Sequence, residues 1–262
     1  MCLKKVVGIL RAISGSDHPK NFTTAIIAAG GSSARFDSVL TKQMTSICGV
    51  PMIVHTLLAF ENCECIHEIV VSARKSEIGF YEKFGEIYGI TKLTAVVEGG
   101  NTRQESVMNG LEAVNDKSKY VAIADGARCL VTPEQIASVC RSAYKYGAAT
   151  AAHRSTDTVK IADKKGFIDS TADRENVWLA QTPQVFKTKL YRAAAYTALK
   201  KGYEATDDNM LVEFVKHPVR LVECGANNIK VTTVDDLTVA SAVIEERIRI
   251  SERLSSSEGE EA

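Results

Sequence analysis

The most informative chemistry in this 262-residue chain is a segment of small residues followed by two cations. Residues 24–27 form an apolar run, residues 28–31 (Ala-Ala-Gly-Gly) follow it directly, and Arg35 and Lys42 come next. Small side chains let backbone N–H groups approach phosphate oxygens, and nearby cations neutralise the remaining charge. A strand that ends in this way is typical of a triphosphate-binding loop, so the segment predicts a nucleotide site.

Two better-known glycine motifs do not match this segment. A P-loop needs Gly-Lys followed by Ser or Thr, whereas Lys42 stands between a threonine and a glutamine. The dinucleotide fingerprint needs glycines at its first, third and sixth positions, but after Gly30 the other two positions hold Ser32 and Arg35. A P-loop NTPase and a dinucleotide-dependent dehydrogenase are therefore not expected.

Polar residues cluster at three further places along the chain. Residues 99–103 and residues 125–128 (Asp-Gly-Ala-Arg) each follow an apolar run, and residues 227–230 (Asn-Asn-Ile-Lys) lie near the C-terminus. The carboxyl ends of parallel strands meet at one edge of a sheet, and ligands bind in the crevice beyond that edge. Together with residues 28–42, these segments predict one polyanion site.

Each of these residues also has a structural interpretation. Arg35 and Lys42 would then be solvated loop cations, and Lys230 would be an ordinary exposed lysine. Asp125 would cap a turn and pair with Arg128. The functional interpretation therefore requires a fold that brings the groups together.

The composition excludes several classes of partner. Lys plus Arg and Asp plus Glu both number 32, so no overall field favours nucleic acid or an anionic membrane. No stretch approaches the ~20 apolar residues needed to cross a bilayer. The seven cysteines lack the spacing of zinc or redox motifs, which favours reduced thiols. The sequence predicts a cytoplasmic protein without nucleic-acid or membrane partners.

Neither a protein-bound metal centre nor a covalent mechanism is expected. The five histidines show no HxH or HExxH spacing, so no zinc or hydrolytic metal site is predicted. No serine has the context of a nucleophile elbow with a companion histidine. The remaining prediction is phosphate chemistry driven by positioning and charge stabilisation.

Apolar runs alternate with helical patterns along the central part of the chain. The runs cover residues 24–28, 68–73, 93–97 and 120–124. Such alternation is the signature of parallel βαβ units. The predicted fold class is α/β, with a doubly wound, mainly parallel Rossmann-like sheet.

Composition also marks the ends of the domain. Residues 1–22 precede the first apolar run and form an N-terminal extension, whereas residues 255–262 are only Ser, Gly, Glu and Ala. Such a tail cannot bury apolar surface. We therefore expect one large domain over residues 23–253 and disorder over residues 254–262. Residues 233–236 match a capping box that begins a long amphipathic helix.

A protruding β-arm is predicted at about residues 154–175. Residues 158–162 and 167–170 are expected to form two short strands, joined by a turn at residues 164–166. An isolated two-stranded ribbon is marginally stable, so docking on a second copy is the simplest way to stabilise it. The arm therefore predicts a homodimer.

Eight short motifs occur in the order of a known family. They are Ala28-Ala29-Gly30 with Arg35 and Lys42-Gln43, Gly99-Gly100 with Arg103 and Ser106-Val107, Asp125-Gly126-Ala127-Arg128, Asp157-Thr158-Val159-Lys160, Asp173-Arg174 before Trp178, Gln181-Thr182-Pro183-Gln184, Thr206-Asp207-Asp208, and Asn228-Ile229-Lys230-Val231-Thr232. In these motifs, from about residue 23 to residue 249, the chain resembles the 2-C-methyl-D-erythritol 4-phosphate cytidylyltransferase family of the sugar-nucleotidyltransferase superfamily.

The resemblance implies transfer of a cytidylyl group from CTP to methylerythritol phosphate, with release of pyrophosphate, in non-mevalonate isoprenoid synthesis. It implies Mg²⁺, held mainly by the CTP phosphates, as cofactor. The catalytic cations would be Arg35, Lys42 and Lys230. The nucleotide-binding residues would be Ala28, Ala29, Gly30, Gly31, Gly99, Gly100, Ser106 and Lys230. The residues that bind the sugar phosphate would be Asp125, Arg128 and Thr182, with Thr158 and Arg174 contributed by the partner's arm.

Two alternative functions stay open at the level of sequence. A cytidylyltransferase acting on ribitol 5-phosphate would share the CTP site and differ where the acceptor binds, although residues 157–160 and Arg174 favour methylerythritol phosphate. A catalytically silent nucleotide-binding paralogue would tolerate the loss of one of the three cations Arg35, Lys42 and Lys230. The presence of all three favours an enzyme.

Overall fold

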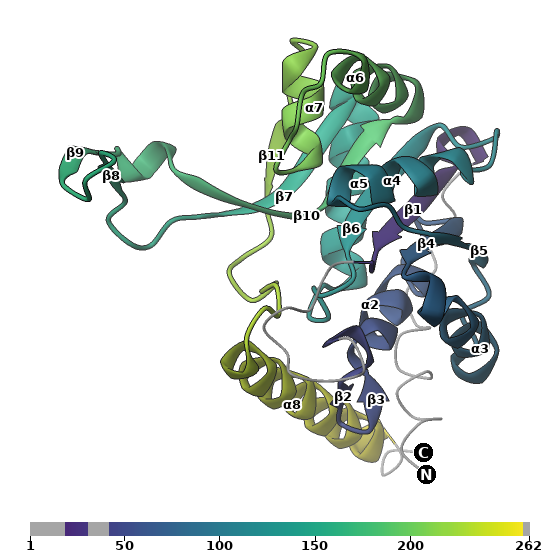
Figure 1. The fold of residues 1–262 in the computed structure, drawn as a ribbon. Coiled ribbons are helices and arrows are strands. Elements are labelled where there is room, and N and C mark those ends of the chain that lie inside the picture. Colours follow the sequence, from purple (N-terminus) through teal and green to yellow (C-terminus); the bar gives the residue numbers. More distant parts are fainter. Residues whose placement is uncertain (1–18, 31–41, 259–262) are drawn as a thin grey trace.

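A seven-stranded sheet forms the centre of the molecule in the computed structural model, which describes residues 19–30 and 42–258 (Figure 1). Gly31 and Arg35 lie outside the described residues, as does the extension up to residue 18. The strands are β1 Thr23–Ala28, β4 Glu68–Ala73, β5 Leu93–Glu98, β6 Tyr120–Asp125, β7 Ala148–Arg154, β10 Trp178–Lys187 and β11 Arg220–Glu223. Their order across the sheet is β11-β7-β10-β6-β1-β4-β5.

The sheet is mixed but mainly parallel, as the sequence predicts. β1 pairs in parallel with β4 and β6, and Ala28 lies beside both Ser72 and Asp125 at the carboxyl ends. Among the described strands of the sheet, only β10 runs antiparallel to both of its neighbours, β6 and β7. Because the ends of β1, β4 and β6 coincide, residues that follow them meet at a single edge.

Helices cover both faces of the sheet. They are α2 Met52–Glu61, α3 Ile78–Tyr88, α4 Arg103–Glu112, α5 Pro133–Tyr146, α6 Thr188–Lys200, α7 Asp208–Phe214 and α8 Val234–Glu258. Side chains alternate along β1, so that Ala25 and Ile27 pack among α2, α3 and α5, whereas Ile26 packs among α4, α6 and α7. The two cores are the physical basis of the predicted doubly wound α/β fold.

Polar side chains cap the helices that lead from the sheet edge. At the start of α5, Thr132 Oγ1 accepts a hydrogen bond from Gln135 N, and Thr132 N donates the reciprocal bond to Gln135 Oε1. Pro133 takes the first helical position. The predicted box at the start of α8 is present, since Thr233 Oγ1 accepts from Asp236 N at 3.2 Å and Asp236 accepts from Thr233 N at 2.8 Å. These caps determine where both helices begin.

The C-terminal helix is longer than the composition suggests. α8 continues to Glu258, so the prediction of disorder from residue 254 is wrong for residues 254–258. A helix that has already formed gains one backbone hydrogen bond with each added residue, and this needs no apolar burial. None of the helices in the described ranges is both long and apolar enough to span a membrane.

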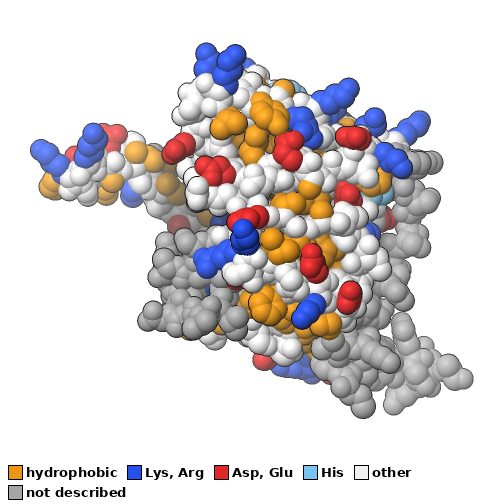
Figure 2. Space-filling view, turned by 45° about the vertical axis from the view of Figure 1, so that its right-hand side comes forward, with side chains coloured by type: hydrophobic (Ala, Val, Ile, Leu, Met, Phe, Trp, Pro, Cys, Tyr) orange, Lys and Arg blue, Asp and Glu red, His pale blue; other side chains and the backbone are white. Residues whose placement is uncertain are grey.

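The predicted arm is a separate two-stranded ribbon. β8 Lys160–Ala162 pairs in antiparallel fashion with β9 Ile168–Thr171, and Figure 1 shows the ribbon projecting from the body beyond β7 and β10. Figure 2 shows both hydrophobic and charged side chains on this projection. Phe167 and Ile168 are 69% and 65% exposed. An apolar surface of this kind on a thin ribbon is typical of a segment that packs against a partner.

The first prediction concerns the contact between α4 and β1. A methyl group added at Gly110 would lie 2.6 Å from Cγ2 of the buried Ile26. We expect Gly110→Ala to lower the free energy of unfolding by about 1–3 kcal/mol, because overpacking a core outweighs the helix propensity of alanine. Urea denaturation measures this change. Gly79→Ala, where the added methyl group meets no atom within 4 Å, is the control and is expected to be neutral or stabilising; equal stability of the two variants would contradict the prediction.

Candidate active site

A cavity of about 540 Å³ lies at the carboxyl edge of the sheet. Its lining residues come from the first glycine-rich segment, the start of α4, the end of β6 and the segment before α8. They are Ala28, Gly30, Lys42, Gln43, Arg74, Gly100, Asn101, Thr102, Arg103, Ser106, Asp125, Ala127 and Lys230. The segments predicted to converge on one polyanion site therefore do converge, as far as they are described.

The carboxylate of Asp125 is the centre of the charged groups in this cavity. Its Oδ1 lies 3.0 Å from Arg103 Nε, and its Oδ2 lies 3.0 Å from Lys230 Nζ and 3.7 Å from Arg128 Nε. Burial alone would raise the pKa of Asp125, but Arg103, Lys230 and Arg128 lower it from 3.8 to about 2. The group is therefore a carboxylate at neutral pH and holds three cations from separate parts of the chain.

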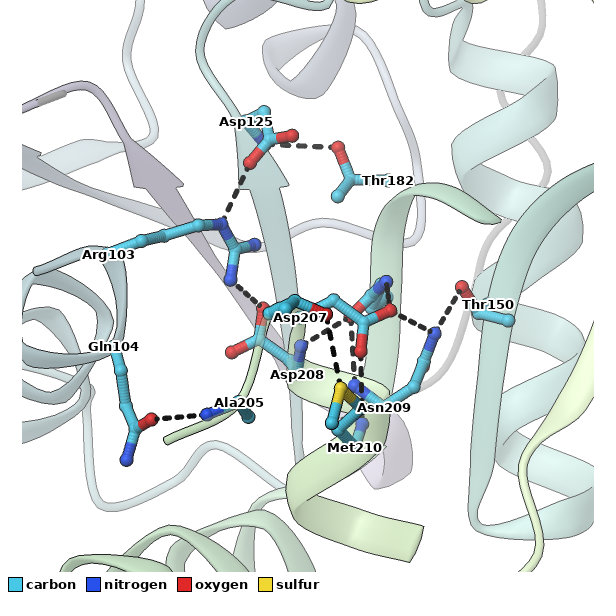
Figure 3. A network of polar contacts seen from close by, with 12 residues as sticks. Arg103, Gln104, Asp125, Thr150, Thr182, Ala205, Asp207, Asp208, Asn209 and Met210 are labelled. Carbon is cyan, nitrogen blue, oxygen red and sulfur yellow. Dashed lines mark hydrogen bonds and ion pairs between the residues drawn. The ribbon is translucent and has the colours of Figure 1, made fainter. Parts of the chain in front are cut away.

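Arg103 connects this carboxylate to a second buried one. Its Nη1 lies 2.7 Å from Asp208 Oδ2, at the start of α7 (Figure 3). Burial disfavours the charged guanidinium, but Asp208 and Asp125 more than compensate and raise the pKa of Arg103. Tyr191 donates a hydrogen bond of 2.5 Å from its hydroxyl to the other oxygen of Asp208. Arg103 is thus fixed between two carboxylates.

A polar network under α7 holds Asp208 in place (Figure 3). Gln184 Oε1 accepts hydrogen bonds from the backbone N–H groups of Asp208 and Asn209, at 2.9 and 3.1 Å. Gln184 Nε2 donates to Asp207 Oδ2 at 2.9 Å, and Asp207 caps the helix by accepting from Met210 N. The buried side chain of Gln184, on the antiparallel strand β10, therefore orients the acidic start of α7.

The loop before α8 brings two lysines to the cavity. Asn228 Nδ2 donates to Thr182 O at 2.8 Å, and Asn228 O accepts from Arg128 Nη1 at 2.7 Å. Lys42 Nζ donates to Val231 O at 3.0 Å, next to Lys230 in the chain. Lys42 and Lys230 lie 188 positions apart in the sequence, and this loop is the reason they share a cavity.

The glycines beside Ser106 permit a close backbone approach. Ser106 Oγ accepts from Gly100 N at 3.1 Å and donates to Thr102 O at 2.8 Å. A methyl group added at Gly100 would lie 2.2 Å from Glu105 Cβ, and one added at Gly99 would lie 3.0 Å from Ser106 Oγ. A larger residue at position 100 would displace the start of α4, so the wall of the cavity requires glycine there.

Comparison with known proteins identifies the family. A family model described as IspD, 2-C-methyl-D-erythritol 4-phosphate cytidylyltransferase, matches residues 23–246. The chain belongs to this family. The 2-C-methyl-D-erythritol 4-phosphate cytidylyltransferases of Pelotomaculum thermopropionicum and Syntrophus aciditrophicus are 42% and 41% identical to it over 224 and 221 residues. These matches cover 85% and 84% of this chain and 94% of each relative.

Solved structures agree with this assignment. The structure of 4-diphosphocytidyl-2C-methyl-D-erythritol synthase from Anaerococcus prevotii matches with a TM-score of 0.77 at 30% identity, covering 86% of this chain and 99% of that one. The 2-C-methyl-D-erythritol 4-phosphate cytidylyltransferase of Thermus thermophilus matches with a TM-score of 0.68 at 30% identity, covering 85% of this chain and 98% of that one. The nucleotidyltransferase family and the α/β fold predicted from the sequence are confirmed.

The predicted site residues are distributed as follows in this cytidylyltransferase-family chain. Those that line the cavity are Ala28, Gly30, Lys42, Gly100, Ser106, Asp125 and Lys230. Arg128 and Thr182 contact the Asp125 residue itself, since Thr182 Oγ1 accepts from Asp125 N at 3.0 Å. Ala29 and Gly99 are tied to β4 by hydrogen bonds to Ser72 O and Ala73 O. Gly31 and Arg35 lie outside the described residues.

Two predicted substrate residues lie on the arm instead. Arg174 donates to Thr156 O at 3.4 Å, and Thr158 is exposed. No contact between either residue and the Asp125 cluster is present among the described residues. In a single chain the arm therefore does not complete the cavity.

The sequence assigns no role to the groups that link the cavity to α7. It marks Arg103 only as a cation after the glycine pair, and Asp208 only as part of a motif. The pattern Asp207-Asp208 before a helix accounts for the first residue as an N-cap and leaves the second unexplained. Because the helix needs only one cap, the second acidic residue, Asp208, is the sequence signal that could have predicted an ion pair with Arg103.

The second prediction follows from the lowered pKa of Asp125. The pKa of Asp125 in the folded protein lies below its ordinary value of 3.8. The ionised carboxylate therefore contributes its full stabilisation of the fold at pH values above 3.8, and this contribution is lost as the pH falls toward 2. We expect Asp125→Asn to lower the free energy of unfolding by about 2 kcal/mol at pH 7, and this difference from the wild type to be roughly halved near pH 3. Denaturant unfolding at both pH values measures it. Asp116→Asn, on an exposed turn, is the control; a difference for Asp125→Asn that does not vary with pH would contradict the assignment.

Proposed function

We propose that this chain transfers a cytidylyl group from CTP to 2-C-methyl-D-erythritol 4-phosphate and releases pyrophosphate. The observation that carries the proposal is the meeting of Lys42 and Lys230 with the Asp125 cluster in one cavity at the carboxyl edge of the sheet. Membership of the cytidylyltransferase family supports the identity of both substrates. The cytoplasmic location expected from the sequence stays a prediction.

The nucleotide is proposed to bind along the glycine-rich walls of the cavity. Ala28 is the last residue of β1, and the small residues Ala29, Gly30 and Gly31 follow it in the sequence. Gly100 and Ser106 line the facing wall, where a side chain at position 100 would meet Glu105, and Gly99 precedes them on the chain. Backbone N–H and C=O groups together with a serine hydroxyl can read the hydrogen-bonding edge of a pyrimidine. These residues are therefore proposed to contact the base and ribose of CTP.

The chemical step needs positioned cations more than a strong base. A phosphate oxygen of the acceptor, already ionised, attacks the α-phosphorus of CTP in line. A new P–O bond forms on one side while the bond to the β-phosphate oxygen breaks on the other, and pyrophosphate leaves with the bonding electron pair. Charge accumulates on the oxygens around the α-phosphorus. Lys42 and Lys230, with Arg35 from the segment that is not described, are proposed to stabilise that charge.

The donor set fits a divalent ion held mainly by the nucleotide. The described residues contain no group of three or more His, Cys, Asp or Glu side chains that could hold a metal ion. Both oxygens of Asp125 already face cations at 3.0 Å. Mg²⁺ bound to the CTP phosphates would supply further charge neutralisation for the departing pyrophosphate. The protein residues would bind and orient the phosphates around it.

The acceptor is proposed to bind beside Asp125, between two subunits. Asp125, Arg128 and Thr182 form the wall within one chain. Thr158 and Arg174 stand away from that wall on the exposed arm, whose apolar surface suits a second copy. We propose that the arm of the partner subunit supplies these two residues in a two-fold homodimer. An acceptor phosphate would then meet cations from both chains.

The third prediction tests the reaction by pyrophosphate release. CTP with 2-C-methyl-D-erythritol 4-phosphate is expected to react, whereas ATP, GTP and UTP with the same acceptor, and CTP with ribitol 5-phosphate, are expected to react far more slowly. Lys42→Ala and Lys230→Ala are each expected to lower kcat by about 100- to 1,000-fold, because each removes a donor to transition-state charge. Lys83→Ala, on the exposed face of α3, is the matched control.

Three outcomes of that assay would count against the proposal. Reaction of CTP with ribitol 5-phosphate and not with 2-C-methyl-D-erythritol 4-phosphate would identify ribitol 5-phosphate as the acceptor. Binding of CTP without pyrophosphate release from any acceptor would favour a silent nucleotide-binding protein. Wild-type turnover in both Lys42→Ala and Lys230→Ala would show that neither lysine has a catalytic role.

The fourth prediction tests the shared site by mixing subunits. Lys42→Ala and Arg174→Ala homodimers are each expected to be weakly active, because every site lacks one group. A heterodimer of the two holds one site with both groups, so a random mixture is expected to recover about a quarter of the wild-type rate. Mixing Lys42→Ala with Lys230→Ala is the control and should give no recovery, since both lysines come from the same chain. No recovery in heterodimers verified by native mass spectrometry would show that the arm acts in its own subunit or not at all.

A further inference from the structure

Arg103 has a hydrogen-bond donor that neither of its ion pairs uses. Its Nε lies 3.0 Å from Asp125 Oδ1, and its Nη1 lies 2.7 Å from Asp208 Oδ2. The third nitrogen, Nη2, makes no hydrogen bond with any described residue. This nitrogen is not buried, and the side chain of Arg103 is 28% exposed. Nη2 is therefore accessible to a ligand.

This donor faces the cavity around Asp125. A guanidinium is planar, and its Nε–H and one N–H of Nη2 point in the same direction. The Nε–H of Arg103 points to Asp125 (Figure 3), so an N–H of Nη2 opens on the same side. Arg103, Asp125 and Lys230 all line the cavity of about 540 Å³. The unused N–H therefore lies at the wall beside which the acceptor is proposed to bind.

Asp208 fixes the direction of the donor. The side chain of Asp208 is only 1% exposed, and it accepts a hydrogen bond of 2.5 Å from the Tyr191 hydroxyl. The backbone N–H of Asp208 donates to Gln184 Oε1 at 2.9 Å. An arginine held on two sides by buried carboxylates cannot turn to follow a ligand. A donor in a fixed position suits the recognition of one particular ligand atom.

The charge around Arg103 favours a hydroxyl group over a phosphate. On this side of Asp125, two carboxylates face one guanidinium, which leaves one negative charge in excess. Lys230 and Arg128 approach the other oxygen, Oδ2, where a phosphate would meet cations. A hydroxyl is neutral, and it can accept from an N–H while it donates to a carboxylate oxygen. The Arg103 side of the cavity thus suits the polyol part of an acceptor.

We propose that Arg103 determines specificity for the acceptor by donating from Nη2 to one hydroxyl oxygen of the polyol phosphate. Asp125 accepts the proton of that hydroxyl in a hydrogen bond, and the acceptor's phosphate lies toward Lys230. The role of Arg103 rests on the proposed transfer reaction and adds to it a residue that selects the polyol. A site built to bond a hydroxyl strongly rejects a ligand that lacks it.

The fifth prediction compares pyrophosphate release with four acceptors at saturating CTP. They are 2-C-methyl-D-erythritol 4-phosphate and its 1-deoxy, 2-deoxy and 3-deoxy analogues. Arg103→Lys keeps the charge but loses the planar set of donors, so we expect it to lower kcat/KM for the parent acceptor by about 10- to 100-fold, chiefly through KM. For the one analogue that lacks the contacted hydroxyl, variant and wild type are expected to agree within about 3-fold. KM for CTP is expected to stay within about 3-fold of the wild-type value, because the donor contacts the acceptor.

A second variant and a matched control accompany this comparison. Arg103→Gln keeps amide donors without the charge, and the same dependence on that one hydroxyl is expected for it. Arg192→Lys makes the same chemical change as Arg103→Lys at an arginine outside the cavity, which contacts Glu112 and Leu111 O. We expect Arg192→Lys to match the wild type with all four acceptors.

Two results would overturn the role of Arg103. One is an equal loss in both Arg103 variants with every acceptor, and the other is a rise in KM for CTP as large as the rise in KM for the acceptor. A wild-type protein that releases no pyrophosphate with the parent acceptor would refute the transfer reaction itself, and the role of Arg103 with it.

Discussion

The buried carboxylate of Asp125 is the interaction on which the arrangement of the site depends. The side chain of Asp125 is only 11% exposed, so burying its charge without a partner would destabilise the fold. Without the carboxylate, the three cations around it would repel one another. The ion pairs of Asp125 with Arg103, Arg128 and Lys230 offset both the desolvation of the carboxylate and the repulsion between the cations. Each cation comes from a different structural context, so the ion cluster also joins those parts of the chain at one edge of the sheet.

The antiparallel strand β10 has a clear structural role in this sheet. β10 carries Thr182, which bonds the backbone of Asp125, and Gln184, which orients the start of α7. Asp208 at that helix start holds Arg103 from the side opposite Asp125. Where catalysis relies on fixed charges, buried polar groups behind the cavity are expected to hold the charged side chains in place. The network behind the cavity and the cations in front of it form one connected unit.

The two edges of the sheet present different electrostatic designs. At the carboxyl edge, cations are balanced by Asp125 and Asp208, so the cavity holds its charges in fixed positions before any phosphate arrives. At the amino edge, lysines remain without acidic partners among the described residues, around the uncapped start of α6. Charge held in fixed positions suits the stabilisation of a transition state.

Local sequence determined the elements of this protein and the chemical class of its residues. The periodicity of the apolar runs predicted four parallel strands within about one residue, because side-chain alternation and burial are local properties. Small residues before Lys42 indicated phosphate binding for a similar reason, since backbone access depends on neighbouring side chains. Tertiary structure alone decided that Lys42 and Lys230 share a cavity, that Asp208 faces Arg103, and that Thr158 stands apart from both. The residues involved are separated by up to 188 positions, and the energy of an ion pair depends on distance and burial, which no local pattern encodes.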